Sequence, residues 1–336
     1  MIPNPIPFFA FFVCACWLTG KIKQNDESLP SHLRLNGSSI GNTLGKHKED
    51  VLQPSVGLYR NDKLIAHGVL VDRKGYLLSK ASSSVGARTI RTSNDQSFSI
   101  RIRKRDEHTD LALWQITGSA QTWKTVQWFD QNKNAGLGTW SVSPGAELKD
   151  IKLGVLSANP RVILREGGVM GVLLEDTNSS VAGITITEVL PQSAGDRAGL
   201  RIMDRILRLD RRTVRTSKQI NQLLKTKDPG DLLTLRVNRR GKEMDIRVTL
   251  GHRSVAFDLF NRNLLMSGPV SKRKDHFPLI IQNDLPLHKE MMGGGLYNLR
   301  GECLGINIAR VDRVTTYTLP YPIILPILSG WLNELL

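Results

Sequence analysis

From Val51 onward the chain is a succession of short strand-like runs separated by turn residues, and this pattern most constrains its fold. Residues 64–71 form a largely apolar run that ends at the turn 72–75, and residues 98–102 alternate between apolar and polar side chains with a strand's period of two. Similar runs recur at the spacing of β-sandwiches and barrels. The 29 glycines among 336 residues also favour a turn-rich β protein over a helical bundle.

The texture changes in the middle of the chain. Residues 184–187 predict a strand, 193–199 a one-turn helix, and 216–225 a longer helix that begins with the capping-box pair Thr216 and Gln219. A β-hairpin is predicted over residues 233–250. These elements predict a self-contained α+β module. The β pattern then returns, with a final helix expected over 323–336.

The first 20 residues carry no charged side chain, and the apolar stretch 6–18 is short for a membrane span. Four interpretations remain open: a cleaved secretory signal, a lipid anchor at Cys16, an uncleaved anchor, or a plain apolar tail. The first three imply export to the periplasm or cell envelope. Residues 21–50 are polar and are expected to be a linker.

Three cysteines, Cys14, Cys16 and Cys303, are too few for a disulfide framework or a cysteine-based zinc site. We expect no metal site and no cofactor. The net charge of +15 is spread over several clusters that contain no interleaved aromatic residues. A specific nucleic-acid partner is therefore not expected, and the clusters are interpreted as solvated faces, with contact to an acidic envelope surface as the alternative. The clusters are Arg101, Arg103, Lys104 and Arg105; Arg205, Arg208, Arg211, Arg212 and Arg215; Arg239, Arg240 and Lys242; and Lys272, Arg273 and Lys274.

Several motifs, in the right order, are similar to those of trypsin-like serine peptidases of the HtrA family. Residues 68–82 and 109–113 resemble the family stretches that carry the catalytic histidine and aspartate. Residues 277–299 resemble the stretch around the nucleophile, and 301–307 closely match the strand that follows it. The resemblance implies a two-barrel, trypsin-like β fold. It also implies self-association, since the family is usually trimeric.

The middle module resembles a PDZ domain. Residues 191–206 match its pattern of small residues followed by an aspartate, and the loop 168–172 lies where the family binds a peptide carboxylate. In HtrA proteins the PDZ domain follows the whole protease, whereas here it interrupts the second barrel. The expected organisation is therefore a leader at 1–20, a linker at 21–50, the first part of the trypsin-like fold at 51–164, a PDZ domain at 165–252, and the remainder of the second barrel with a C-terminal helix at 253–336.

The family's catalytic positions fall on residues that cannot perform its chemistry. The histidine position is Ser82, whose hydroxyl is not a base near neutral pH, and the nucleophile position is Met292, whose thioether has no proton to lose. Only Asp110 is retained, and Glu290 stands at a glycine position of the oxyanion loop, where its charge would repel a developing anion.

Two further histidines are interpreted as surface residues, although either could in principle supply a base: His67 and His108. Cys303 is interpreted as a core residue rather than a nucleophile. Shifting the alignment by one or two residues brings no histidine to the family's base position and no serine to its nucleophile position.

Peptide recognition by a PDZ domain depends mostly on backbone groups, because an added strand pairs with a sheet edge and its carboxylate meets N–H groups. The residues expected to bind it are Gly168, Val169, Met170, Gly171 and Val172. Ile220 and Leu224 of the helix are expected either to line the side-chain pocket or to belong to the core.

The sequence thus predicts an HtrA-like, proteolytically inactive protein that binds peptide or protein C-termini in the cell envelope. Two alternatives stay open. One is an active serine endopeptidase with an unrecognised triad, and the other is a protein that binds polyanions or membrane surfaces through its basic faces.

Overall fold

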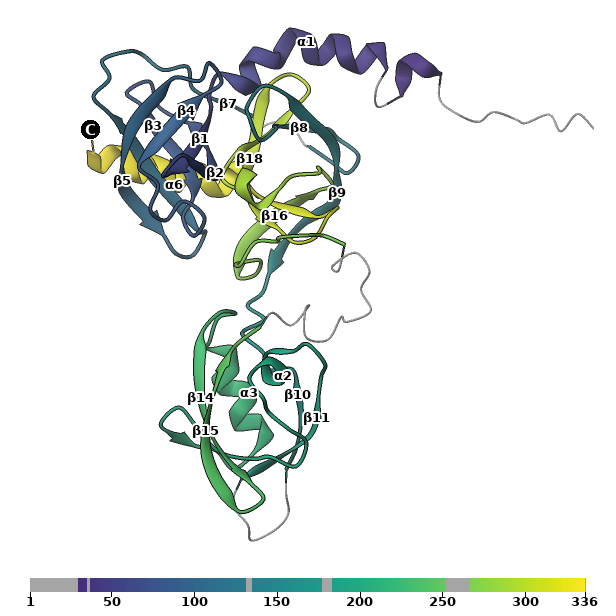
Figure 1. Ribbon diagram of the computed structural model, residues 1–336. Helices are drawn as coiled ribbons and strands as arrows, with labels where there is room; N and C mark the ends of the chain where they lie inside the picture. Colours follow the sequence, from purple (N-terminus) through teal and green to yellow (C-terminus); the bar gives the residue numbers. More distant parts are fainter. Residues whose placement is uncertain (1–29, 35–36, 131–134, 177–182, 252–265, 336) are drawn as a thin grey trace, which may run out of the picture.

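The computed structural model describes residues 30–34, 37–130, 135–176, 183–251 and 266–335 (Figure 1). The predicted leader at residues 1–20 lies outside these ranges. The first part of the fold is a closed six-stranded barrel in the order β1-β2-β3-β6-β5-β4, with β1 pairing β4 to close it. Its strands are β1 (Ser55–Arg60), β2 (Lys63–Leu70), β3 (Tyr76–Lys80), β4 (Thr89–Thr92), β5 (Ser97–Asp106) and β6 (Leu111–Thr117).

A second sheet follows in the order β17-β8-β9-β16-β19-β18-β7, and the pairing of β17 with β18 closes six of its strands into a second barrel. Its strands are β7 (Gln127–Trp128), β8 (Trp140–Pro144), β9 (Ile151–Ile163), β16 (Phe277–Asn283), β17 (Gly295–Asn298), β18 (Glu302–Arg310) and β19 (Thr316–Pro320). The apolar runs of the sequence form these strands, as predicted, and the two closed barrels confirm the expected trypsin-like architecture.

The α+β module is inserted between β9 and β16 of the second barrel, and in Figure 1 it lies below the barrels. Ile163 at the end of β9 pairs with Phe277 at the start of β16. The chain therefore leaves and re-enters the barrel at adjacent points, which is where an inserted domain disturbs its host least. The module contains β10 (Val172–Asp176), β11 (Ile184–Val189), α2 (Ala194–Arg197), β12 (Arg205–Leu209), β13 (Arg212–Thr213), α3 (Ser217–Lys225), β14 (Leu232–Arg239) and β15 (Lys242–Thr249).

The module has its own core, built from α3 and the inner faces of the strands. The predicted cap of α3 is present: the Thr216 hydroxyl accepts a hydrogen bond from the N–H of Gln219, and the Gln219 side chain accepts one from the N–H of Arg215. A second apolar cluster joins the two barrels to each other and to the C-terminal helix α6 (Tyr321–Leu335), which was predicted over 323–336.

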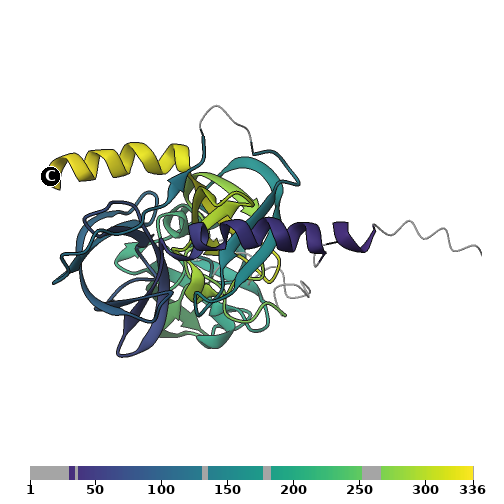
Figure 2. The same ribbon diagram turned by 90° about the horizontal axis from the view of Figure 1, so that it is seen from above.

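The segment read from sequence as a linker contains helix α1 (Ser38–Leu52), preceded by the short helix η1 (Ser31–Leu33). Most side chains of α1 are polar, which favoured the linker interpretation. Three of its apolar side chains are nevertheless buried: Ile40, Val51 and Leu52. Seen from above, α1 runs over the second barrel and α6 along the first (Figure 2). In the described ranges, every helix is either too short or too polar to cross a membrane.

Candidate functional site

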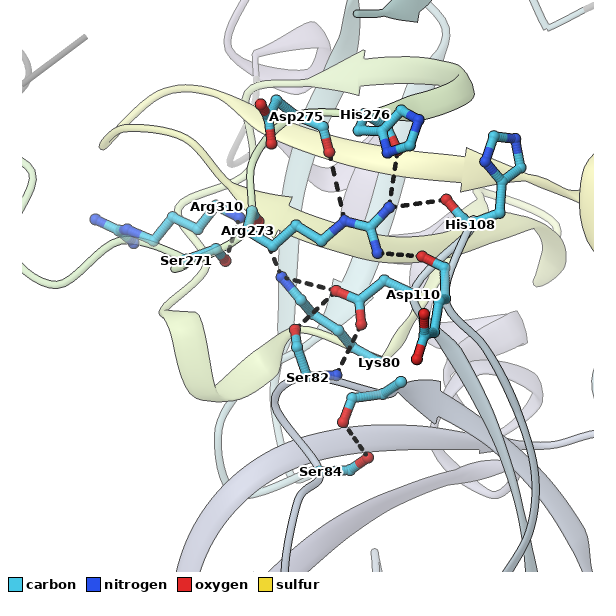
Figure 3. Close-up of polar contacts among 12 residues, drawn as sticks. Lys80, Ser82, Ser84, His108, Asp110, Ser271, Arg273, Asp275, His276 and Arg310 are labelled. Carbon is cyan, nitrogen blue, oxygen red and sulfur yellow. Dashed lines mark hydrogen bonds and ion pairs between the residues drawn. The ribbon is translucent and has the colours of Figure 1, made fainter. Parts of the chain in front are cut away.

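Ser82 and Asp110 meet at the end of β3, in front of the first residue of β6 (Figure 3). One carboxylate oxygen of Asp110 accepts the backbone N–H of Ser82 at 2.7 Å, and the other accepts the Ser82 hydroxyl, also at 2.7 Å. Asp110 is buried and Ser82 is exposed. Both line a cleft of about 970 Å³ that Glu290 also lines. Two of the three predicted triad positions are therefore in direct contact, with a hydroxyl where an imidazole would be expected.

Lys80, a residue that the sequence analysis did not single out, is buried beside them. Its ammonium lies 3.7 Å from the Asp110 oxygen that Ser82 also contacts, and it donates a hydrogen bond to the carbonyl of Arg273 at 3.2 Å. Burial lowers the pKa of Lys80 from 10.5 to about 8; Asp110 opposes this shift and Arg273 adds to it. A charged residue inside the apolar run 76–81 was the sequence signal for this contact.

Arg273 lies in the segment that returns from the inserted module, and its side chain attaches this segment to the first barrel (Figure 3). Its guanidinium donates to the carbonyls of Glu107, and to those of His108 and His276 at 2.8 Å each. The interpretation of this basic cluster as a solvated face is wrong here, because Arg273 is half-buried and the neighbouring Lys274 is buried. Sequence could not reveal these acceptors, since most of them are backbone carbonyls far away along the chain.

Met292 is fully buried at the end of the short helix η2 (Lys289–Met291). Its carbonyl accepts the N–H of His67 on β2 at 3.1 Å, and its own N–H donates to the carbonyl of Lys289 at 3.3 Å. Gly293 follows at φ +96°, where a Cβ would lie 2.3 Å from the carbonyl oxygen of His67. Only glycine fits this approach, so the turn after Met292 is held tightly against the first barrel.

The prediction that His67 is a surface residue is wrong, since it is 1% exposed. One face of β2 packs inside the first barrel and the other packs against η2, so the second half of this strand is buried on both faces. The His67 Nε2 lies 3.2 Å from the carbonyl of Ala146, whereas Nδ1 has no hydrogen-bond partner among the described residues. Burial lowers the pKa of His67 to about 4. His108 is exposed, as predicted.

Cys303 is fully buried in the cluster that joins the barrels, which confirms its interpretation as a core residue. Burial raises the pKa of its thiol to about 12, so the thiolate form of a nucleophile is strongly disfavoured.

The module presents a strand edge beside a loop with available N–H groups. Among the described strands, β10 pairs only with β11, so its other edge is open. The N–H groups of Gly168 and Val169 donate to backbone carbonyls at 2.8 and 2.9 Å, but those of Met170 and Gly171 have no acceptor among the described residues. Gly171 has φ +73°, a left-handed conformation that lets successive N–H groups converge on an anion.

Helix α3 lies beside β10, and the strip between them is where the resemblance to a PDZ domain implies the peptide groove. Ile220 and Leu224 are buried within the module's core, which is one of the two roles expected for them. Val172, Leu174 and Leu223 are half-buried and pack against the same core.

Residues 168–250 match the PDZ domain family. Part of the chain is 28% identical over 111 residues to a "Probable periplasmic serine endoprotease DegP-like" of Hahella chejuensis, covering 30% of this chain and 24% of that protein. It is 30% identical over 94 residues to "Serine endoprotease DegS" of Haemophilus influenzae, covering 27% of this chain and 28% of that protein. This chain is HtrA-like and carries a PDZ domain.

A longer match runs over 265 residues of a "Probable periplasmic serine endoprotease DegP-like" of Marinomonas sp., at 23% identity, covering 55% of this chain and 56% of that protein. The matches thus span about a quarter to just over half of the relatives' own lengths.

Proposed function

We propose that this HtrA-like protein binds peptide or protein C-termini through its PDZ domain and does not hydrolyse peptide bonds. The observation that carries the first half is the open edge of β10 next to the N–H groups of Met170 and Gly171, which have no acceptor in the part of the chain that the structure describes. An extended peptide can add a strand to that edge while its terminal carboxylate accepts hydrogen bonds from the loop. The relatives are named periplasmic endoproteases, which supports a location in the cell envelope.

The chemistry of the three positions supports the proposed absence of hydrolysis. Asp110 accepts a hydrogen bond from the hydroxyl of Ser82, and a serine hydroxyl cannot take a proton from a nucleophile near neutral pH. Met292 offers no nucleophile. The N–H of Met292, which an oxyanion hole would need, is already donated to the carbonyl of Lys289.

Peptide titration of the full-length protein tests the binding half. A peptide with a free C-terminal carboxylate should bind in the micromolar range, roughly, because ordering a flexible peptide offsets part of the contact energy. The same peptide with a C-terminal amide should bind at least about tenfold more weakly, since the loss of charge removes the main partner of the loop. Equal binding of acid and amide would overturn carboxylate capture.

A pair of glycine variants makes this test specific to the loop. Gly171→Ala puts a side chain at φ +73° and should weaken binding of the acid. Gly241→Ala introduces a similar strain at φ +84° in a hairpin turn with open space around it, and should leave binding unchanged. Incubation of the same protein with an unfolded protein substrate tests the other half. Cleavage that persists after repurification would overturn the absence of hydrolysis, and cleavage that also survives Asp110→Ala would contradict the assignment of the site.

A further inference from the structure

One end of the peptide groove is bridged by a hydrogen bond between its two walls. Asp176 is the last residue of β10 and Ser217 is the first residue of α3. A carboxylate oxygen of Asp176 accepts the backbone N–H of Ser217 at 2.5 Å. The N–H groups of a helix's first turn have no acceptor within the helix, and its positive end favours a carboxylate, so this contact satisfies both groups.

The alternation of side chains along β10 aims Asp176 at the helix. Val172 and Leu174 are half-buried and pack on the module's core, and Asp176 continues the same face at a spacing of two residues. Leu173 and Glu175 occupy the opposite, exposed face. The Asp176 carboxylate therefore spans the groove rather than pointing away from it.

The position of this bridge sets a length. Four residue steps separate Val172 from Asp176, which is roughly 13 Å at about 3.3 Å per residue. A peptide that pairs antiparallel with β10, with its carboxylate at the Met170–Gly171 loop and its last residue opposite Val172, reaches Asp176 at its fifth residue from the end. Any residue further upstream has to pass between the strand and the helix where Asp176 and Ser217 are joined.

We infer that Asp176 is a specificity-determining residue that limits the groove to about the last four residues of a ligand. This inference rests on the proposed function. A longer peptide gains contacts upstream only by displacing the Asp176 carboxylate from the N-terminus of α3. The loss of one hydrogen bond to a charged group corresponds to about a tenfold change in affinity or more.

Two peptides and three variants of the full-length protein test this. The peptides have four and ten residues, share their last four residues, and end in valine with a free carboxylate. Asp176→Ala removes the acceptor. Ser217→Pro removes the donor while keeping the carboxylate, and proline suits the first position of a helix, where its missing N–H has no intrahelical role. Thr216, which precedes it, already has an extended conformation compatible with a following proline. Glu175→Ala is the matched control, since it removes a carboxylate from the adjacent position on the opposite face.

The wild-type protein and Glu175→Ala should bind the two peptides with affinities within about twofold of each other. Asp176→Ala and Ser217→Pro should leave binding of the short peptide unchanged, which shows that the groove is intact, and should bind the long peptide about tenfold more tightly. An unchanged ratio in both variants would overturn the inference. A gain in Asp176→Ala alone would also overturn it, because the carboxylate would then act through its charge and not through the bridge. Failure of every protein to bind either peptide at millimolar concentration would instead refute the proposed function.

Discussion

The buried Lys80 should make the free energy of unfolding depend measurably on pH. It is 1% exposed, and burial lowers its pKa in the folded protein to about 8 from the usual 10.5. Between these two values the unfolded chain holds a proton that the folded protein has released. The free energy of unfolding therefore increases with pH in this window, and the destabilisation caused by the buried charge is present in full below pH 8.

The magnitude follows from the shift. A difference of about 2.5 pKa units, at about 1.4 kcal/mol per unit, amounts to about 3 kcal/mol when the lysine is fully charged in both states. Between pH 7 and pH 10 about 2 to 3 kcal/mol of this should be recovered, since the unfolded lysine is still mostly charged at pH 10. Asp110 is close enough to reduce the shift but not to cancel it, because desolvation is the larger cause.

Denaturant unfolding of the wild type and of Lys80→Met across this pH range measures the effect. Tyr297 and Cys303 are also buried with raised pKa values, and both lower the stability as pH rises, but they are common to the two proteins. The readout is therefore the difference in the free energy of unfolding between wild type and variant, which should change by about 2 to 3 kcal/mol in favour of the wild type from pH 7 to pH 10. Lys74→Met, which removes an exposed lysine from the same barrel, is the control. Parallel pH profiles for wild type and Lys80→Met would refute a buried, charged Lys80.

Three other results are expected. Burial lowers the pKa of His67 to about 4, so the free energy of unfolding should decrease by up to about 3 kcal/mol as the pH falls from 6.5 to 4. In the same unfolding assay, this decrease should be smaller for His67→Gln. Met292→Ser alone should give no detectable cleavage of a fluorogenic peptide, because it supplies a hydroxyl without a base, and robust turnover would mean that a base other than residue 82 exists. Residues 168–252 expressed alone should fold cooperatively, since the module has its own core, and a broad, non-cooperative thermal transition by circular dichroism would contradict this.

Most of the fold could be predicted because its strands are marked locally. Apolar runs of four to eight residues bounded by turn residues became strands almost everywhere, and α3 was marked by both its cap and its apolar face. Helix α1 was missed because its side chains are mainly polar, and only a few of them make the contacts that hold it on the second barrel. Its existence depends on tertiary packing, which no local pattern records.

The candidate site, too, could be predicted only where local motifs mark it. Motif order was enough to predict that positions 82 and 110 lie together, and the hydrogen bonds between Ser82 and Asp110 agree with that prediction. The burial of His67 could not be predicted, because the covering element η2 comes more than 200 residues later. Lys80 and Arg273 were missed for the same reason: Lys80 donates to the carbonyl of Arg273, and Arg273 donates to the carbonyls of Glu107 and His108, all of them far away along the chain.

The contacts of Lys80 connect Asp110 with the segment that returns from the inserted module. The chain returns from the module through Arg273, whose side chain donates to the carbonyls of His108 and His276 and whose own carbonyl accepts a hydrogen bond from the Lys80 ammonium. Lys80 in turn lies against Asp110, the carboxylate that in a peptidase would orient a histidine. A histidine at position 82 would compete with Lys80 for that carboxylate, because both would need the same oxygens. In this arrangement Asp110 is linked through Lys80 to the returning segment, which Arg273 also attaches to the first barrel at the carbonyls of Glu107 and His108.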